Sequence, residues 1–161
     1  MTTTRVIVTI LASITYLIVI GGATYEHLSV VPRWSAAPPA SLAMFQGPYG
    51  LAPETFWQVI HPVTLLLLLG ALTFGWRTPA RPYLLASLVG YVLVLLATAL
   101  YFVPELLAII GTPYSPTSDP GLVARAGQWE RLSLIRLGVL LILAIVLLAG
   151  LIRSAGGRLH A

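Results

Sequence analysis

Four long stretches of apolar residues, nearly free of charge, constrain this chain more than any other feature of its sequence. A hydrocarbon core of about 30 Å requires about 20 apolar residues in a helix, and the sequence meets that length over residues 6–28, 53–76, 82–103 and 129–152. Only 9% of the 161 residues are charged and 58% are hydrophobic, so a soluble fold of this size has too little polar surface to cover its apolar side chains. We therefore predict an all-α protein, an antiparallel four-helix transmembrane bundle that forms a single integral membrane domain.

The remaining composition excludes several classes of protein. The chain has no cysteine, which excludes disulfides, thiol redox chemistry and thiolate metal sites. Its net charge of +4 comes from arginines scattered singly between the apolar runs, unlike the clustered charge of a nucleic-acid-binding surface. The expected partners are the lipid bilayer and a hydrophobic small molecule, with no nucleic acid. Assembly into a homo-oligomer is a further alternative.

The arginines also predict how the chain lies in the membrane. All nine basic residues are arginine, and one side of a four-span topology holds no acid but carries Arg5, Arg77, Arg81, Arg153 and Arg158. By the positive-inside rule both termini lie in the cytoplasm. The connections 29–52 and 104–128 then lie on the extracytoplasmic side of what we take to be a bacterial cytoplasmic membrane. Both are rich in proline, glycine and aromatic residues, so we expect two structured loops packed over the bundle; the alternative is that they lie on lipid headgroups.

Polar side chains recur at helical spacing inside the spans. Such residues usually face the interior of a bundle or a cavity. Along the third span Tyr91, Thr98, Tyr101 and Glu105 step by 7, 3 and 4 residues, the spacing of one helix face. The other spans show comparable stripes, namely Trp57, His61 and Thr64, then Trp129, Ser133 and Arg136, and two adjacent stripes that end at Glu26 and His27. We expect these stripes to meet in one chamber in the outer half of the membrane, because the inner halves are nearly all aliphatic.

Arg136 lies inside the fourth span, where an unpaired guanidinium is costly. We expect it to pair with a glutamate, either as a structural ion pair or as a clamp for a substrate anion. The candidate catalytic residues are His61, Glu26, Arg136 and Tyr101, and the candidate substrate-binding residues are Trp57, Trp129 and Glu105. In these roles a histidine takes up a proton or binds a metal, a glutamate is base or ligand, and Arg136 stabilises a developing anion.

The histidines and glutamates also form a candidate metal-ligand set. His27, His61, Glu26 and Glu130 supply ligand types that suit a transition metal such as Cu, Fe or Zn. Two histidines on different helices also suit haem, which we favour less. The spacing matches neither H-x-x-x-H nor the paired E-x-x-H of di-iron bundles. The cofactor therefore stays open, and the alternative for His61 is a hydrogen-bonded interior histidine.

Three segments resemble the anthrone-oxygenase-like family of small four-span membrane proteins. They are the run 21–27 (GGATYEH) with 31–34 (VPRW), the run from Pro53 through Phe56, Trp57 and His61 to Pro62, and the pattern Trp129-x-x-Leu132-x-x-x-Arg136. Some fungal members are associated with the oxidation of anthrones to anthraquinones. The resemblance implies a polar site at Glu26, His27, His61 and Arg136, and oxygen chemistry on an aromatic substrate.

The function expected from these patterns is that of a membrane-embedded oxidoreductase or oxygenase. Its substrate is expected to be hydrophobic and aromatic or quinone-like, and to bind at the polar site in the outer half of the bundle. Two alternatives stay open. One is a non-catalytic membrane protein that binds a metal, haem or lipid, and the other is a structural subunit of a larger membrane complex.

Overall fold

The computed structural model describes residues 2–156, and within that range every regular element is a helix. The elements in chain order are α1 (Thr2–Tyr25), η1 (Glu26–Val30), α2 (Val31–Trp34), η2 (Ala40–Phe45), α3 (Glu54–Gly75), α4 (Arg81–Ala97), η3 (Thr98–Phe102), α5 (Val103–Ile110) and α6 (Pro120–Gly156). Here η1 and η3 are π-helical and η2 is a 3-10 helix. Several of these elements join end to end into longer rods.

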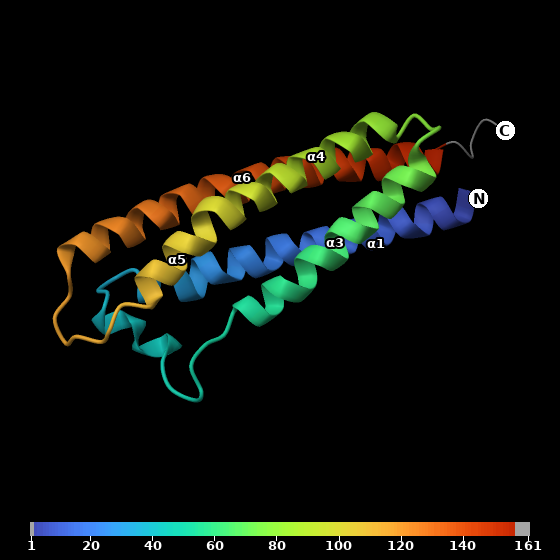
Figure 1. Cartoon of the computed structure of the whole chain (residues 1–161). Helices are drawn as coiled ribbons and strands as arrows, with labels where there is room; N and C mark the ends of the chain where they lie inside the picture. The colour runs from blue at the N-terminus through green and yellow to red at the C-terminus, as the bar shows by residue number, and fades with distance from the viewer. Residues whose placement is uncertain (1, 157–161) are drawn as a thin grey trace.

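Four rods are long and apolar enough to cross a membrane, which suggests an integral membrane protein. They are Thr3–Trp34, Glu54–Gly75, Arg81–Ile110 and Pro120–Ser154. Consecutive rods run in opposite directions, and both ends of the described chain lie at one end of the molecule (Figure 1). Helix α1 packs against α3 and α6, and α4 packs against the same two helices. The prediction of four long apolar helices packed antiparallel is confirmed.

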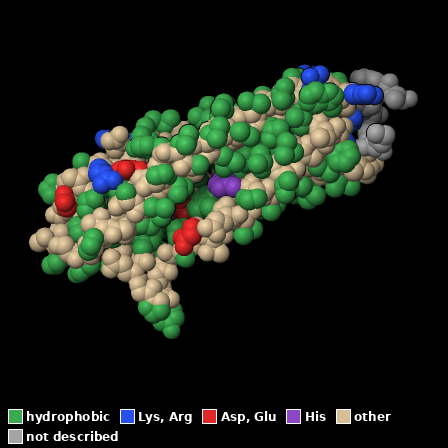
Figure 2. Space-filling model, viewed as in Figure 1, with side chains coloured by type: hydrophobic (Ala, Val, Ile, Leu, Met, Phe, Trp, Pro, Cys, Tyr) green, Lys and Arg blue, Asp and Glu red, His purple; other side chains and the backbone are tan. Residues whose placement is uncertain are grey.

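The two ends of the bundle differ in chemistry. At the end where the chain begins and finishes, which we call the terminal end, basic side chains gather (Figure 2). There Arg5 donates a hydrogen bond from Nη2 to the carbonyl of Ser154 at 2.8 Å, and Arg81 lies 4.0 Å from the centre of the Trp76 ring. Arg158 lies outside the described residues. The opposite end, which we call the loop end, carries the connections 35–53 and 111–119.

Three helices extend farther than the spans expected from the sequence. The first reaches Trp34 rather than residue 28, the third reaches Ile110 rather than residue 103, and the fourth begins at Pro120 rather than residue 129. Apolar length alone sets the expected limits, and it gives no reason for a helix to continue past a proline. The structure continues through Pro32 and Pro104 because each follows a π-helical segment.

The two π-helical segments have one physical cause. A proline inside an α-helix lacks an N–H and clashes with the carbonyl four residues earlier. For Pro32 that carbonyl belongs to Leu28 in η1, and for Pro104 it belongs to Leu100 in η3. One extra residue per turn widens the helix at that carbonyl, so the chain passes the proline without ending. At the start of α6, Asp119 Oδ1 accepts the backbone N–H of Gly121 at 2.7 Å, so Asp119 caps the extension of this helix beyond residue 129.

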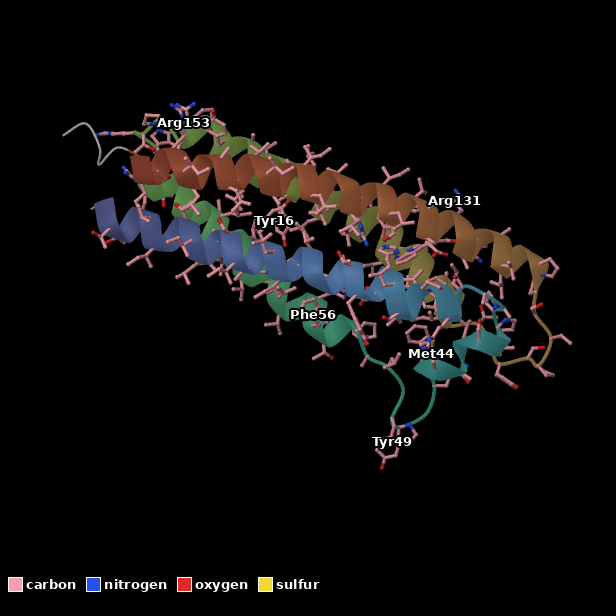
Figure 3. The ribbon with its side chains drawn as sticks, turned by 180° about the vertical axis from the view of Figure 1, so that it is seen from behind. Tyr16, Met44, Tyr49, Phe56, Arg131 and Arg153 are labelled. Atoms are coloured by element: carbon pink, nitrogen blue, oxygen red, sulfur yellow. The ribbon has the colours of Figure 1, made fainter. Side chains whose placement is uncertain are left out.

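The first connection packs over the loop end, as expected, and the second does so much less. Trp34 and Leu42 are buried against Ile109 and Trp129 in a second apolar core. A lobe of the same connection projects from the bundle, with Tyr49 at its tip 98% exposed (Figure 3). Residues 111–119 are mostly exposed. One hydrogen bond, from the N–H of Asp119 to the carbonyl of Pro38 at 2.8 Å, joins the two connections.

The main core fills the bundle between the terminal end and the π-helical level, with Tyr16, Leu68, Leu84, Tyr91 and Leu147 among its most buried members. The terminal half of the bundle, nearly all aliphatic in sequence, also holds buried hydroxyls. Thr9 and Ser13 are almost fully buried on the interior face of α1. Each donates to the carbonyl four residues earlier, which satisfies the hydroxyl proton inside its own helix.

Candidate functional site

The polar residues of the bundle interior form two chains of side-chain contacts near the π-helical segments. The first chain, which we call the tryptophan–histidine chain, consists of Glu26, Trp57, His61 and Tyr91. The second, the arginine chain, consists of His27, Ser133, Arg136 and Thr98. Segment η1 supplies Glu26 and His27, and η3 supplies Thr98. Because π-helical insertions often mark functional sites, their place beside both chains supports a site at this level.

The tryptophan–histidine chain crosses from η1 through α3 to α4. Trp57 Nε1 donates to Glu26 Oε1 at 2.9 Å. One turn further along α3, the ring of His61 stacks on that of Trp57, with centroids 5.2 Å apart and planes 21° from parallel. His61 Nδ1 then lies 2.7 Å from the hydroxyl oxygen of Tyr91, whose side chain is completely buried. The spacing of four residues on α3 places the two stacked rings on one face.

The arginine chain centres on Ser133, which is 1% exposed. Arg136 donates from Nη2 to Ser133 Oγ at 2.8 Å and from Nη1 to Thr98 Oγ1 at 3.0 Å. The Ser133 hydroxyl also contacts His27 Nε2 at 3.1 Å. The Arg136 guanidinium lies 4.2 Å from the centre of the Phe102 ring, in a cation–π contact. The hydroxyl of Ser133 therefore connects both π-helical segments through α6.

Arg136 does not form the ion pair that the sequence leads us to expect. Among residues 2–156 the one salt bridge joins Arg125 and Glu105. The guanidinium of Arg136 instead contacts hydroxyls and an aromatic face, and it interacts with the Glu26 carboxylate only across a distance beyond ion-pair contact. Both His27 and His61 also lie within its electrostatic influence. The positive charge is thus held by neutral groups, with a carboxylate nearby but not in contact.

The surface of the bundle has a depression, or hollow, on one side. Figure 2 shows it between α3 and the rod formed by α4 and α5, with a histidine side chain at its rim and an acidic side chain deeper inside. His61 and Trp57 are both half-buried. The Nδ1 atom of His61 contacts Tyr91, whereas its Nε2 atom has no hydrogen-bond partner among the described residues.

Two glutamates lie away from the polar chains. Glu105 forms a two-pronged contact with Arg125, at 2.8 and 3.0 Å, on the outside of the bundle. The expected stripe from Tyr91 to Glu105 assumed a regular helix, and the extra residue of η3 rotates everything after it. Glu130 accepts from Ser35 at 3.1 Å. The prediction that Glu105 lies in the chamber is therefore wrong.

Two aromatic candidates also lie to one side of the chains. Trp129 is buried in the second apolar core and donates from Nε1 to the carbonyl of Phe102 at 2.9 Å. The ring of Tyr101 packs edge-on against that of Phe102. Both residues pack against the phenyl ring that contacts the Arg136 guanidinium. Phe102 itself was missed, because an apolar residue in an apolar span carries no sequence signal of contact with a cation.

The four candidate metal ligands do not come together. Within the described range no group of three or more His, Cys, Asp or Glu side chains is placed to hold a metal ion. Each member has another contact, since Glu26 accepts from Trp57, His27 contacts Ser133, His61 contacts Tyr91 and Glu130 accepts from Ser35. The residues present therefore do not fit a resident metal, and the alternative of an interior hydrogen-bonded histidine describes His61 better.

Comparison with known proteins adds no assignment. No family model matches the sequence, and no curated protein or solved structure matches it either.

Proposed function

We propose that the protein is a membrane oxygenase that oxidises a hydrophobic aromatic ketone at the polar chains. We further propose that both termini face the cytoplasm and that the loop end faces outward from a bacterial cytoplasmic membrane. The arginine-rich terminal end supports that orientation. The substrate class takes its support from the lateral hollow and from the resemblance to anthrone-oxygenase-like proteins.

One observation carries the proposal, namely the Arg136 guanidinium without an ion-pair partner. A charge inside a membrane span is retained at a cost, and such residues commonly mark functional sites. Among the described residues its contacts are neutral hydroxyls and the Phe102 ring. Such a guanidinium, prearranged and partly desolvated, favours an oxygen atom that becomes negative during the reaction.

Glu26 is the base in this proposal. Of the outer glutamates it is the one that lies on the interior chains, and only its Oε1 is engaged, by Trp57. Glu105 is neutralised by Arg125 on the outside. In this proposal the substrate binds between the carboxylate and the guanidinium, with its acidic carbon facing the base and its oxygen facing the cation.

The proposed reaction converts a doubly benzylic CH2 group into a carbonyl. Glu26 removes one proton, and the electron pair of that C–H bond delocalises into the ketone as an enolate stabilised by Arg136. The enolate carbon is oxidised by O2, the co-reactant, and takes up one proton to give a hydroperoxide. Loss of the second C–H proton forms the new C=O bond and breaks the O–O bond, with the outer oxygen leaving as water. One O2 is reduced per carbonyl formed, and atoms and electrons balance.

The test uses the purified protein in lipid nanodiscs with anthrone, a three-ring ketone that has such a CH2 group. We expect oxygen uptake above the protein-free blank and one quinone formed per O2 consumed, measured with an oxygen electrode and by absorbance. Glu26→Gln and Arg136→Gln should bring the rate to the blank. Glu54→Gln, a change at an exposed glutamate at the start of α3, should keep it.

Two results would overturn the proposal. Saturable binding of the ketone without oxygen uptake would make the protein a non-catalytic binding protein. Neither binding nor uptake, in a folded sample with its normal helical content, would favour a structural subunit.

A further inference from the structure

We propose that His61 acts as a neutral hydrogen-bond donor through Nε2 and that Tyr91 fixes this tautomer through its contact with Nδ1. The group that His61 recognises is a carbonyl or quinone oxygen on a flat aromatic ring. The inference deepens the proposed function and rests on the same hollow. It replaces the sequence-based expectation that His61 takes up a proton. Tyr91 is a positioning residue, since it acts through the imidazole.

The first step concerns the short contact beneath the imidazole. His61 Nδ1 and the Tyr91 hydroxyl oxygen are 2.7 Å apart. N–H···O bonds usually measure about 2.9–3.0 Å, and hydroxyl donors form shorter bonds, about 2.7–2.8 Å when the acceptor is also oxygen. The distance therefore favours the tyrosine hydroxyl as donor and Nδ1 as acceptor.

The second step follows the proton of Tyr91. Its side chain is completely buried on α4, and the large majority of buried side-chain polar groups have a hydrogen-bond partner. Among the described residues the one hydrogen-bond contact of this hydroxyl is His61 Nδ1. Thr64, on α3, lies close enough for its hydroxyl to interact with that of Tyr91, although Thr64 Oγ1 has no well-formed hydrogen bond among the described residues. The imidazole is therefore the acceptor that the geometry provides, and Thr64 is the rival to be tested.

The third step transfers this constraint to the other side of the ring. A neutral imidazole that accepts at Nδ1 carries its proton on Nε2. His61 Nε2 has no partner among the described residues and is not enclosed by the protein. Like charges repel, so beside Arg136 the neutral imidazole is favoured over the cation. The tautomer thus presents an N–H to the hollow.

The fourth step is the chemistry that such a donor recognises. Stacking on Trp57 holds the imidazole plane, and the exposed part of that indole offers a flat apolar surface beside the N–H. An aromatic carbonyl combines the two features, because its ring packs on an apolar face and its oxygen accepts a hydrogen bond. A neutral histidine that polarises a carbonyl while a glutamate removes a proton is an established division of roles in enzymes that form enolates.

The direct test is the nitrogen NMR spectrum of the protein labelled with ¹⁵N-histidine in nanodiscs, with the His61 signals assigned by their loss in His61→Gln. We expect an unprotonated Nδ1 and a protonated Nε2 in the unmodified protein. Tyr91→Phe should abolish this preference, and Thr64→Val should leave it unchanged. A protonated Nδ1, or a tautomer that switches on Thr64→Val, would overturn the inference. The spectrum of the unmodified protein decides even if a variant fails to fold.

A second measurement tests the ligand class without turnover. Anthraquinone and anthracene are a matched pair of three-ring aromatics with and without carbonyl oxygens, and binding is followed by quenching of tryptophan fluorescence. We expect anthraquinone to bind about threefold to tenfold more tightly than anthracene, which is the contribution of one neutral hydrogen bond. His61→Phe should remove this preference for the quinone while keeping an aromatic ring stacked on Trp57. Equal affinities would overturn the inference. Both readouts are independent of oxygen uptake, so an inactive protein with the predicted tautomer and preference would refute the oxygenase proposal alone.

Discussion

The neighbouring glycines Gly21 and Gly22 of α1 offer a sharp test of how the tryptophan–histidine chain is held. A methyl group added at Gly22 would lie 2.7 Å from Phe56 Cε1 and 3.4 Å from Trp57 Cη2, whereas one added at Gly21 would meet no atom within 4 Å. Replacing either glycine with alanine removes the same backbone flexibility from the same helix. The two variants therefore differ in steric contact alone.

The expected magnitudes follow from those distances. Glycine to alanine inside a helix stabilises by about 0.5–1 kcal/mol, which is the full effect expected for Gly21→Ala. At Gly22 the overlap forces the Phe56 ring, and with it Trp57, to shift, and overpacking of this kind costs about 1–3 kcal/mol. Gly22→Ala should therefore range from neutral to about 2 kcal/mol less stable than the unmodified protein.

The assay is reversible unfolding in mixed micelles, followed by far-ultraviolet circular dichroism, together with anthraquinone affinity in nanodiscs. Gly22→Ala should also weaken ligand binding, because Trp57 contacts both Glu26 and His61, and Gly21→Ala should not. If the two variants are equally stable and bind equally well, then α1 and α3 do not approach as closely at Gly22 as the structure indicates, and the reasoning is refuted.

Three further predictions concern separate contacts. Ser133→Ala removes an acceptor of Arg136 and should lower the free energy of unfolding by about 2 kcal/mol, since hydrogen bonds to charged groups contribute about 1.5–3 kcal/mol. The control is Ser13→Ala, at another buried serine whose hydrogen bond stays within its own helix, and it should cost under about 0.5 kcal/mol. Equal losses of stability in micelle unfolding would contradict the role of Ser133 in joining helices across the bundle. Asp119→Ala removes the cap of α6 and should lower stability by about 1 kcal/mol, with Asp119→Asn close to normal in the same assay. Glu105→Gln breaks an exposed ion pair, so it should change stability by less than about 1 kcal/mol, an effect that shrinks as salt is raised; a large effect independent of salt would contradict its place on the outside.

The sequence predicts the helices well because hydrocarbon thickness leaves few alternatives for long apolar runs. It also predicts which faces point inward wherever the helix is regular, as for Trp57 and His61 on α3. It fails after Thr98, where one added residue in η3 turns Glu105 outward. The signal was present as a Val-Pro pair at 31–32 and again at 103–104, each one residue after a π-helical segment. A polar stripe that crosses such a Val-Pro pair does not continue on the same face of the helix.

The side-chain pairings of the site were harder to predict than its location. We expected Arg136 to pair with a carboxylate, since opposite charges attract, but its guanidinium instead donates hydrogen bonds to the hydroxyls of residues 98 and 133. Which acceptor an arginine meets depends on helix rotation and rise at the ångström scale, and a periodic pattern does not contain that information. The same holds for Tyr91, whose place on a polar stripe is evident while its contact with His61 is not.

The π-helical segments determine which side chains face one another at the loop end of this fold. Each amounts to a single inserted residue, so a one-residue deletion inside 98–102 would return that turn to α-helical winding and rotate the remainder of the rod by about 100°. Such a deletion would swing Glu105 away from Arg125 without disturbing the terminal half of the bundle. Related sequences that differ in length by one residue just before these prolines would thus acquire a different set of side chains at the loop end while keeping the same four-helix frame.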